Sequence, residues 1–285
     1  MKPRLAAATL FVQALVFAQP PPLAQSPAFA QPISEPSQLA AVYEREVDRR
    51  LVLPAPDRAF YAARLTQALQ AADVLVDRAQ FVLLVDRSAN VQAMMLWWAA
   101  PNGARELIGA SPTSTGRPSG FEHFETPTGV FEHSLANTDF RAEGTKNEFG
   151  IRGYGDKGMR VYDFGWVMGR RAWAPGEQLM RLQVHATDRA LLEPRLGRRE
   201  LKGCVRIPAT LNALIDRYGL LDAAYEEAMA AGHRFWVLRE DRMPTPWSGR
   251  WLVVIDSQRT SRPAWASPPR LASAAAVAAA VAASC

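Results

Sequence analysis

The stretch LQVHATDRALLEPRLGRRELKGCVRI, residues 182–207, decides how the rest of the sequence is interpreted. It opens with a β-prone run that ends at His185, and it closes with Gly203-Cys204-Val205-Arg206. A helix is expected directly afterwards, from about Pro208 to Ala230, because proline is tolerated in a first turn and Gly232 lies just past the end. A histidine and a cysteine nineteen residues apart, in such positions, are candidates for a base and a nucleophile.

Short runs typical of β-strands lie on both sides of this stretch. Turn signals such as Asp86-Arg87-Ser88-Ala89-Asn90 and Pro101-Asn102-Gly103 separate them. We expect strands at 81–85, 91–98, 107–110, 161–168, 180–185, 234–239 and 251–256. Many short strands with one main helix predict an α+β fold that is mostly β and mostly antiparallel.

Two helices are expected before the first strand. Apolar residues fall at helical spacing over 37–51 and 57–72, with Ser37 and Asp57 as candidate N-caps. The proline-spaced residues before them predict a linker. We therefore divide the mature chain into a linker with a small N-terminal helical element at 31–77 and a main domain at 78–260.

The first thirty residues predict export. Lys2 and Arg4 precede an apolar run, and Ala28-Phe29-Ala30 supplies the small-x-small pattern of a signal-peptide cleavage site. Removal of residues 1–30 lowers the net charge from +5 to +3. The Ala-rich C-terminal tail at 261–285 contains a run of alanine and valine at 271–284. This run is too short and too weakly apolar for a spanning helix, and we expect a frayed or loosely docked terminal helix there.

The composition excludes several classes of protein. With 48% hydrophobic and 21% charged residues in 285, the chain suits a folded globular protein. A charge of +5 is modest, and the sequence has no basic run with interleaved aromatics, so we expect no nucleic-acid partner. Cys204 and Cys285 permit one disulfide at most, which favours a single working thiol over a disulfide framework.

Two upstream motifs complete a recognisable order. Ser114-Thr115-Gly116 and Thr126-Pro127-Thr128-Gly129-Val130-Phe131 precede the histidine strand and Gly203-Cys204-Val205-Arg206. In this order the motifs resemble the L,D-transpeptidase (YkuD-like) catalytic domain, over roughly residues 78 to 258. The resemblance implies a YkuD-like antiparallel β-sandwich with one main helix after the catalytic cysteine.

The residues also suggest the chemistry directly. A cysteine attacks an acyl carbonyl as its thiolate, so it needs a base and donors for the developing oxyanion. Cys204 is the candidate nucleophile and His185 the candidate base. Gly203 permits a tight turn, and the amide groups of Gly203 and Cys204 are candidate oxyanion donors beside a helix start. Arg206 is a candidate to bind a substrate carboxylate or to hold the loop, while Thr126 to Gly129 is expected to form a structural turn.

The sequence differs from the family's usual motif at two places. Leu201-Lys202 stands where the family usually has Ser-His before Gly-Cys, and Ala186-Thr187 follows His185 where the family usually has glycine. Lys202 places a cation beside the thiol, which lowers a thiol pKa. We assign Lys202 and Thr187 to substrate binding.

The resemblance implies an exported enzyme that acts on peptidoglycan stem peptides. Cys204 forms an acyl-enzyme, and an amine on a neighbouring stem or on a wall-anchored protein resolves it. Two alternatives stay open: a cysteine amidase or L,D-carboxypeptidase that uses water, and a non-catalytic wall-binding domain on a decayed transpeptidase fold. No cofactor is needed, and no zinc site is expected, because His123, His133 and His233 have no partner at a recognisable spacing.

Overall fold

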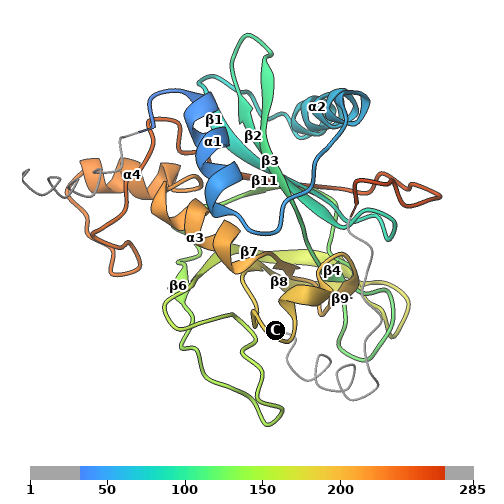
Figure 1. Ribbon diagram of the computed structural model, residues 1–285. Coiled ribbons are helices and arrows are strands. Elements are labelled where there is room, and N and C mark those ends of the chain that lie inside the picture. Colours follow the sequence, from blue (N-terminus) through green and yellow to red (C-terminus); the bar gives the residue numbers. More distant parts are fainter. Residues whose placement is uncertain (1–32, 267–285) are drawn as a thin grey trace, which may run out of the picture. The chain divides into compact units, whose positions relative to one another are not determined.

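The computed structural model describes residues 33–266, which form an α+β fold (Figure 1). The expected signal peptide, the alanine-rich run at 271–284 and Cys285 lie outside the described residues. Within 33–266 no helix is both long and apolar enough to cross a membrane.

The larger sheet contains the first hairpins of the chain. Its strands are β1 (Gln80–Asp86), β2 (Ala93–Ala99), β3 (Arg105–Pro112), β5 (Gly129–Glu132) and β11 (Trp251–Ile255). Their order is β3-β2-β1-β11-β5, and the last strand of the described chain lies parallel to the first. The strands expected at 81–85, 91–98, 107–110 and 251–256 are confirmed with small shifts at their ends.

A second sheet carries the histidine strand. It is formed by β6 (Phe140–Arg141), β7 (Arg160–Arg170), β8 (Glu177–His185) and β10 (Val205–Arg206), in the order β10-β8-β7-β6. β10 runs parallel to β8, as do β4 (Thr115–Gly116) and β9 (Arg199–Leu201) to each other in a small third sheet. The sheets are therefore mixed, although the hairpins β1–β2, β2–β3 and β7–β8 are antiparallel as expected.

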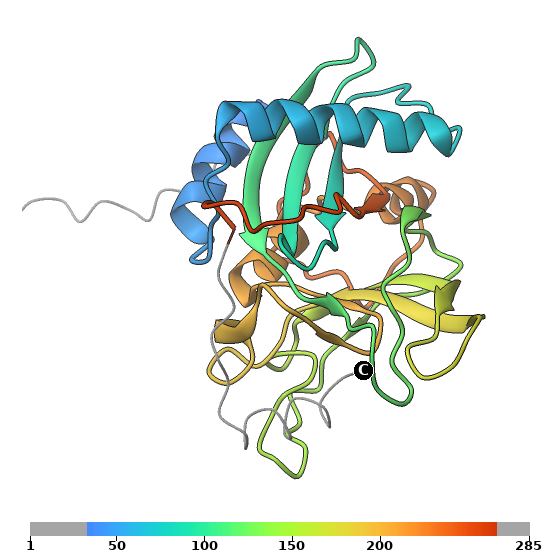
Figure 2. The same cartoon turned by 90° about the vertical axis from the view of Figure 1, so that its right-hand side faces the viewer.

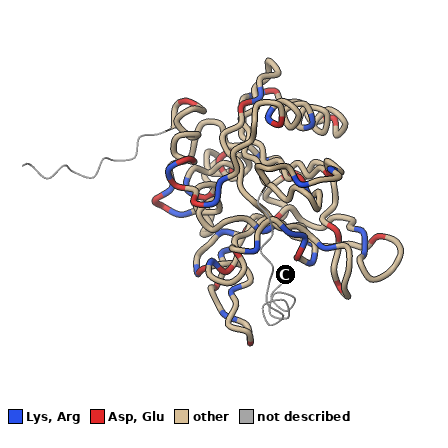
Figure 3. The backbone as a smooth tube through the Cα atoms, turned by 45° about the vertical axis from the view of Figure 1, so that its right-hand side comes forward, with Lys and Arg blue, Asp and Glu red and all other residues tan. Residues whose placement is uncertain are grey.

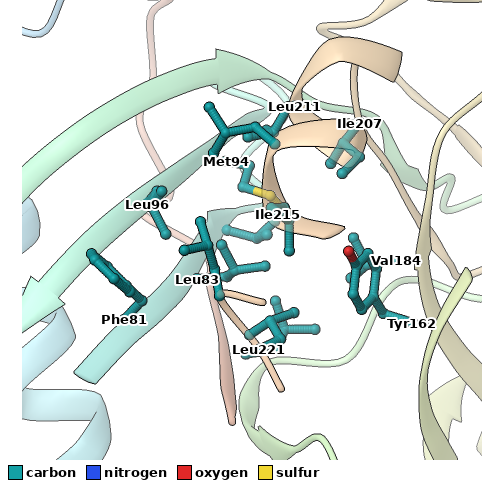
Figure 4. Close-up of a cluster of buried hydrophobic side chains, with 14 of the residues drawn as sticks. Phe81, Leu83, Met94, Leu96, Tyr162, Val184, Ile207, Leu211, Ile215 and Leu221 are labelled. Carbon is teal, nitrogen blue, oxygen red and sulfur yellow. The ribbon is translucent and has the colours of Figure 1, made fainter. Parts of the chain in front are cut away.

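The main core lies between the two larger sheets. Phe81, Leu83 and Val85 of β1 alternate with Val82 and Leu84, so successive side chains face opposite sides of the sheet. The first set packs against the second sheet and α3, and Figure 4 shows members of this cluster, including Tyr162, Val184 and Ile215. The second set faces α2, so both faces of the central strands β1, β2 and β11 are buried and these strands are mostly apolar.

The N-terminal helices cover the larger sheet. α1 (Pro36–Glu46) packs on β3 and α3, while α2 (Ala55–Ala71) extends across the strands (Figure 2). Neither expected N-cap is correct. α1 is capped at Glu35, since the Gln38 side chain accepts hydrogen bonds from the Ser34 and Glu35 amides at 2.7 and 3.3 Å. α2 is capped at Pro54, and Asp57 lies in its first turn.

The single helix expected over 208–230 is wrong. Two helices occur there, α3 (Ala209–Arg217) and α4 (Ala223–Ala230). Gly219, with φ +58°, takes the left-handed conformation that ends a helix, and Leu220 donates back to the Ile215 carbonyl at 3.0 Å. A short 3₁₀ helix, η1 (Glu193–Arg195), lies in the sequence between β8 and β9.

The strand expected at 234–239 is also wrong, because this segment forms turns. Val237 is fully buried and its carbonyl accepts a hydrogen bond from the Arg141 side chain, which takes the place of a neighbouring strand. Phe235 packs edge-to-face against Tyr225, with the ring centroids 4.9 Å apart. Side-chain anchoring thus replaces sheet pairing here.

A buried ionic cluster joins the second sheet to the helices that follow it. The Arg160 guanidinium is fully buried and contacts Asp139 at 2.7 Å, Asp222 at 2.7 Å and Asp216 at 3.5 Å. His133 Nε2 lies 2.7 Å from Asp139, so this histidine does have a partner, six residues along the chain. Along the described backbone, positions of basic and acidic residues are interspersed (Figure 3).

Candidate functional site

The pairing of β10 with β8 brings the histidine and cysteine segments side by side. Val205 is opposite Val184, and Arg206 is opposite His185, in a parallel register. Both valines belong to the core between the sheets, so His185 and Arg206 belong to the opposite face. Cys204, directly before β10, lies with its Sγ 3.8 Å from the Arg181 carbonyl oxygen of β8.

The nucleophile candidate is almost fully buried. Cys204 has 4% of its surface exposed, and it is disulfide-bonded in this structure. Acyl transfer through its sulfur therefore requires prior reduction to the thiol.

The upstream motifs converge on the cysteine loop. The amides of Ser114 and Arg206 each donate to the other's carbonyl, at 3.0 and 2.9 Å. The buried Thr126 hydroxyl donates to the Gly203 carbonyl at 2.7 Å and accepts from the Gly116 amide at 2.8 Å. One side chain thus fastens two motifs to the residue before the nucleophile, which explains the threonine in the turn at 126–129.

Gly203 cannot be replaced without strain. Its φ of +134° favours glycine, and an added Cβ would lie 2.7 Å from Met180 Sδ. Gly116 is equally restricted, since a Cβ there would lie 2.0 Å from the Phe124 carbonyl oxygen and 2.9 Å from Gly203 Cα. The loop therefore depends on close backbone contact at both glycines.

His185 is held as a neutral acceptor. Its Nδ1 lies 2.6 Å from the Ala186 carbonyl oxygen, so Nδ1 carries the proton and Nε2 has a lone pair. Nε2 is buried and has no hydrogen-bond partner among residues 33–266. Burial, followed by the positive charge of Arg206, lowers the pKa of His185 to about 3. The Tyr154 ring packs against the imidazole at 4.7 Å between centroids.

Arg206 is a buried cation next to this histidine. Only 1% of the residue is exposed, and its Nε and Nη2 have no hydrogen-bond partner among the described residues. Burial lowers the pKa of Arg206 to about 10, opposed by the negative charge of Glu200. A guanidinium with unused donors can stabilise an anion that forms or binds nearby.

The two residues assigned to substrate binding are in different surroundings. Lys202 is partly exposed, and its Nζ lies 3.4 Å from a Glu122 carboxylate oxygen, so part of its charge is neutralised. Thr187 is fully buried, and its hydroxyl has no hydrogen-bond partner within the described part of the chain. The assignment of both to substrate contacts stays a prediction.

Polar side chains that the sequence analysis missed extend the histidine face of β8. Tyr154 OH donates to Gln183 Oε1 at 3.3 Å, and Gln183 Nε2 donates to Asp163 at 2.8 Å. Arg181 Nε donates to the same carboxylate at 2.9 Å. The alternation of Arg181, Gln183 and His185 along one strand is the sequence signal that could have identified this polar face.

A cavity of about 510 Å³ is lined by Tyr154, the residue whose ring packs on His185. Phe140, Glu143, Thr145, Tyr154 and Trp236 are among its lining residues. Because Tyr154 both lines the cavity and packs on the His185 ring, a bound molecule there is one side chain away from the imidazole. In the described residues no cluster of histidine, cysteine or carboxylate side chains could hold a metal ion.

Neither a scan against protein-family models nor a search of the curated proteins gives a match for this chain.

Proposed function

We propose that this chain is an exported cysteine acyltransferase of the L,D-transpeptidase type, acting on the stem peptides of peptidoglycan. The observation that carries the proposal is the convergence of Ser114, Thr126 and Gly203 around Cys204, on the strand beside His185. These motifs are far apart in the sequence, and their contacts support a common task for them.

The proposed reaction begins with the reduced thiol. His185 Nε2 accepts the thiol proton as Cys204 Sγ forms a bond to the carbonyl carbon of the third stem residue. Amide donors of Gly203 and Cys204 stabilise the oxyanion, together with the positive charge of Arg206. The carbon–nitrogen bond then breaks, the imidazolium returns its proton to the departing D-alanine amine, and a thioester remains.

An acceptor amine completes the transfer. It attacks the thioester carbonyl, loses its proton to His185, and expels the Cys204 sulfur, which regains a proton from the imidazolium. Burial and then the positive charge of Arg206 lower the pKa of His185, which supports a neutral resting imidazole with a free lone pair on Nε2.

Product analysis tests this proposal against the two alternatives. Reduced wild-type protein is incubated with a purified disaccharide-tetrapeptide, beside Cys204→Ala. Crosslinked dimers and free D-alanine, absent from the variant, are the expected result. Tripeptide with no dimer would replace transfer by hydrolysis, and binding with no product in either protein would favour the non-catalytic domain.

A further inference from the structure

Trp236 is a second candidate binding residue outside the catalytic cluster. Its indole is 73% exposed, which is unusual for so large an apolar side chain. It lines the 510 Å³ cavity beside Tyr154, and it also lines a neighbouring cavity of about 850 Å³. The exposed ring therefore lines two cavities, of which the smaller is also lined by Tyr154, the residue that packs on His185.

The backbone holds this ring in place. The Leu238 amide donates to the Phe235 carbonyl at 3.1 Å, which closes a tight turn with Trp236 and Val237 at its centre. Phe235 packs against Tyr225, and the fully buried Val237 is bound through its carbonyl to Arg141. Arg141 is itself held by Asp216 at 2.8 Å. Anchored neighbours on both sides pre-organise the exposed indole for binding.

The surroundings of Trp236 favour a neutral, hydroxyl-rich ligand. The charged side chains that line the larger cavity have both signs: Arg234, Arg239, Arg242, Glu240 and Asp241. Arg242 pairs with Asp222 at 3.3 Å. Arg239 and Asp241 pair with each other at 2.8 Å, so little net charge is left to select an ionic polymer. A sugar ring presents one C–H face to an aromatic ring and hydroxyls to polar side chains at its edge, and this rim provides both.

We propose that Trp236 and the two cavities beside it bind the glycan strand of the substrate, a chain of N-acetylated hexosamines. The identity of this polymer rests on the proposed function. With a sugar stacked on Trp236, the attached stem peptide enters the smaller cavity at 140–155 and passes Tyr154 towards His185 and Cys204. Trp236 and the two cavities thus bind the polymer at a place separate from the amide bond that reacts.

Binding of a peptide-free glycan tests the inference. Full-length mature protein is titrated with tetra-N-acetylchitotetraose, and indole N–H signals are followed by NMR. The signal that Trp236→Phe identifies by its loss is expected to shift on titration, and Trp236→Ala is expected to weaken binding about tenfold. Trp166→Ala is the matched control, since that indole is 61% exposed on β7 and lines neither cavity. It is expected to bind like the wild type.

Two results overturn the inference. One is the lack of any saturable shift of the Trp236 signal up to about 10 mM oligosaccharide. The other is equal affinity of the wild type and Trp236→Ala, with thermal unfolding showing that the variant is folded. Cys204→Ala is expected to bind the oligosaccharide normally, so glycan binding and thiol acylation are measured separately. A protein that fails to bind the glycan can still be tested for acylation of Cys204, and a protein that is not acylated can still be tested for glycan binding.

Discussion

The Thr126 hydroxyl is the most specific feature of the cysteine loop that can be tested. It is fully buried and hydrogen-bonded on both sides, to the Gly116 amide at 2.8 Å and the Gly203 carbonyl at 2.7 Å. Thr126→Val keeps the shape and leaves one donor and one acceptor buried without their partner. Each such group costs about 1–3 kcal/mol, so we expect a loss of roughly 3 kcal/mol in the free energy of unfolding.

Stability and reactivity are measured together on reduced protein. For a chain of this size the expected loss lowers the melting temperature by about 6–12 °C. Displacement of Gly203 also moves the adjacent thiol, and we expect carbapenem acylation of Cys204 to slow by at least about tenfold. Thr126→Ser keeps the hydroxyl and should recover most of both losses.

The matched control is Thr128→Val, two residues along in the same turn. Thr128 is exposed, so its replacement should change the melting temperature little. A Thr126→Val protein within about 0.5 kcal/mol of the wild type, with unchanged acylation, would refute the reasoning that this hydroxyl holds the nucleophile loop.

Three further predictions concern the buried charges. Arg160→Met removes the buried cation that contacts Asp139, Asp216 and Asp222 together, and should destabilise the protein by about 3–5 kcal/mol in urea unfolding; an unchanged midpoint would contradict this. Burial lowers the pKa of His133, but the charge and hydrogen bond of Asp139 outweigh it and the net shift is upward. His133 therefore stabilises the fold fully below its unfolded pKa of about 6.5, and this contribution is lost as the pH rises through the folded pKa. The stability difference between wild type and His133→Gln should shrink as the pH rises above about 6.5, and a constant difference would argue against the linkage. Burial and Arg206 lower the pKa of His185 to about 3, so the acylation rate should show no inflection near pH 6.5. Arg206→Met leaves the larger cause, burial, in place but should raise that pKa and move the acid limb of the acylation rate to higher pH, whereas an unaltered profile would show that Arg206 does not act on His185.

The sequence predicted the longer strands and the two N-terminal helices well, but not the break between α3 and α4. The strands around Phe81, Trp97 and Val184 were found because each is a sustained apolar or alternating run. The strands β4, β6 and β10 were missed, since two residues carry no periodic signal. The parallel pairing of β1 with β11 was also missed, because it depends on the return of a distant segment.

The sequence predicted candidate site residues, whose roles stay predictions, and did not predict the contacts around them. The order of the motifs pointed to Cys204 and His185, and Gly203 is required for the conformational reason expected. Nothing local shows that Thr126 reaches Gly203, or that Arg160 meets carboxylates from three separate segments. Contacts of that kind are set by tertiary packing, which brings together residues far apart in the sequence.

Intact-protein mass spectrometry after incubation with a carbapenem tests the central claim most directly. The protein is first reduced to release Cys204 from its disulfide, and Cys204→Ala is treated in the same way. The account predicts a single covalent adduct on the wild type and none on the variant. A folded, reduced wild type that forms no adduct, or an equal adduct on Cys204→Ala, would contradict the assignment of Cys204 as an activated nucleophile.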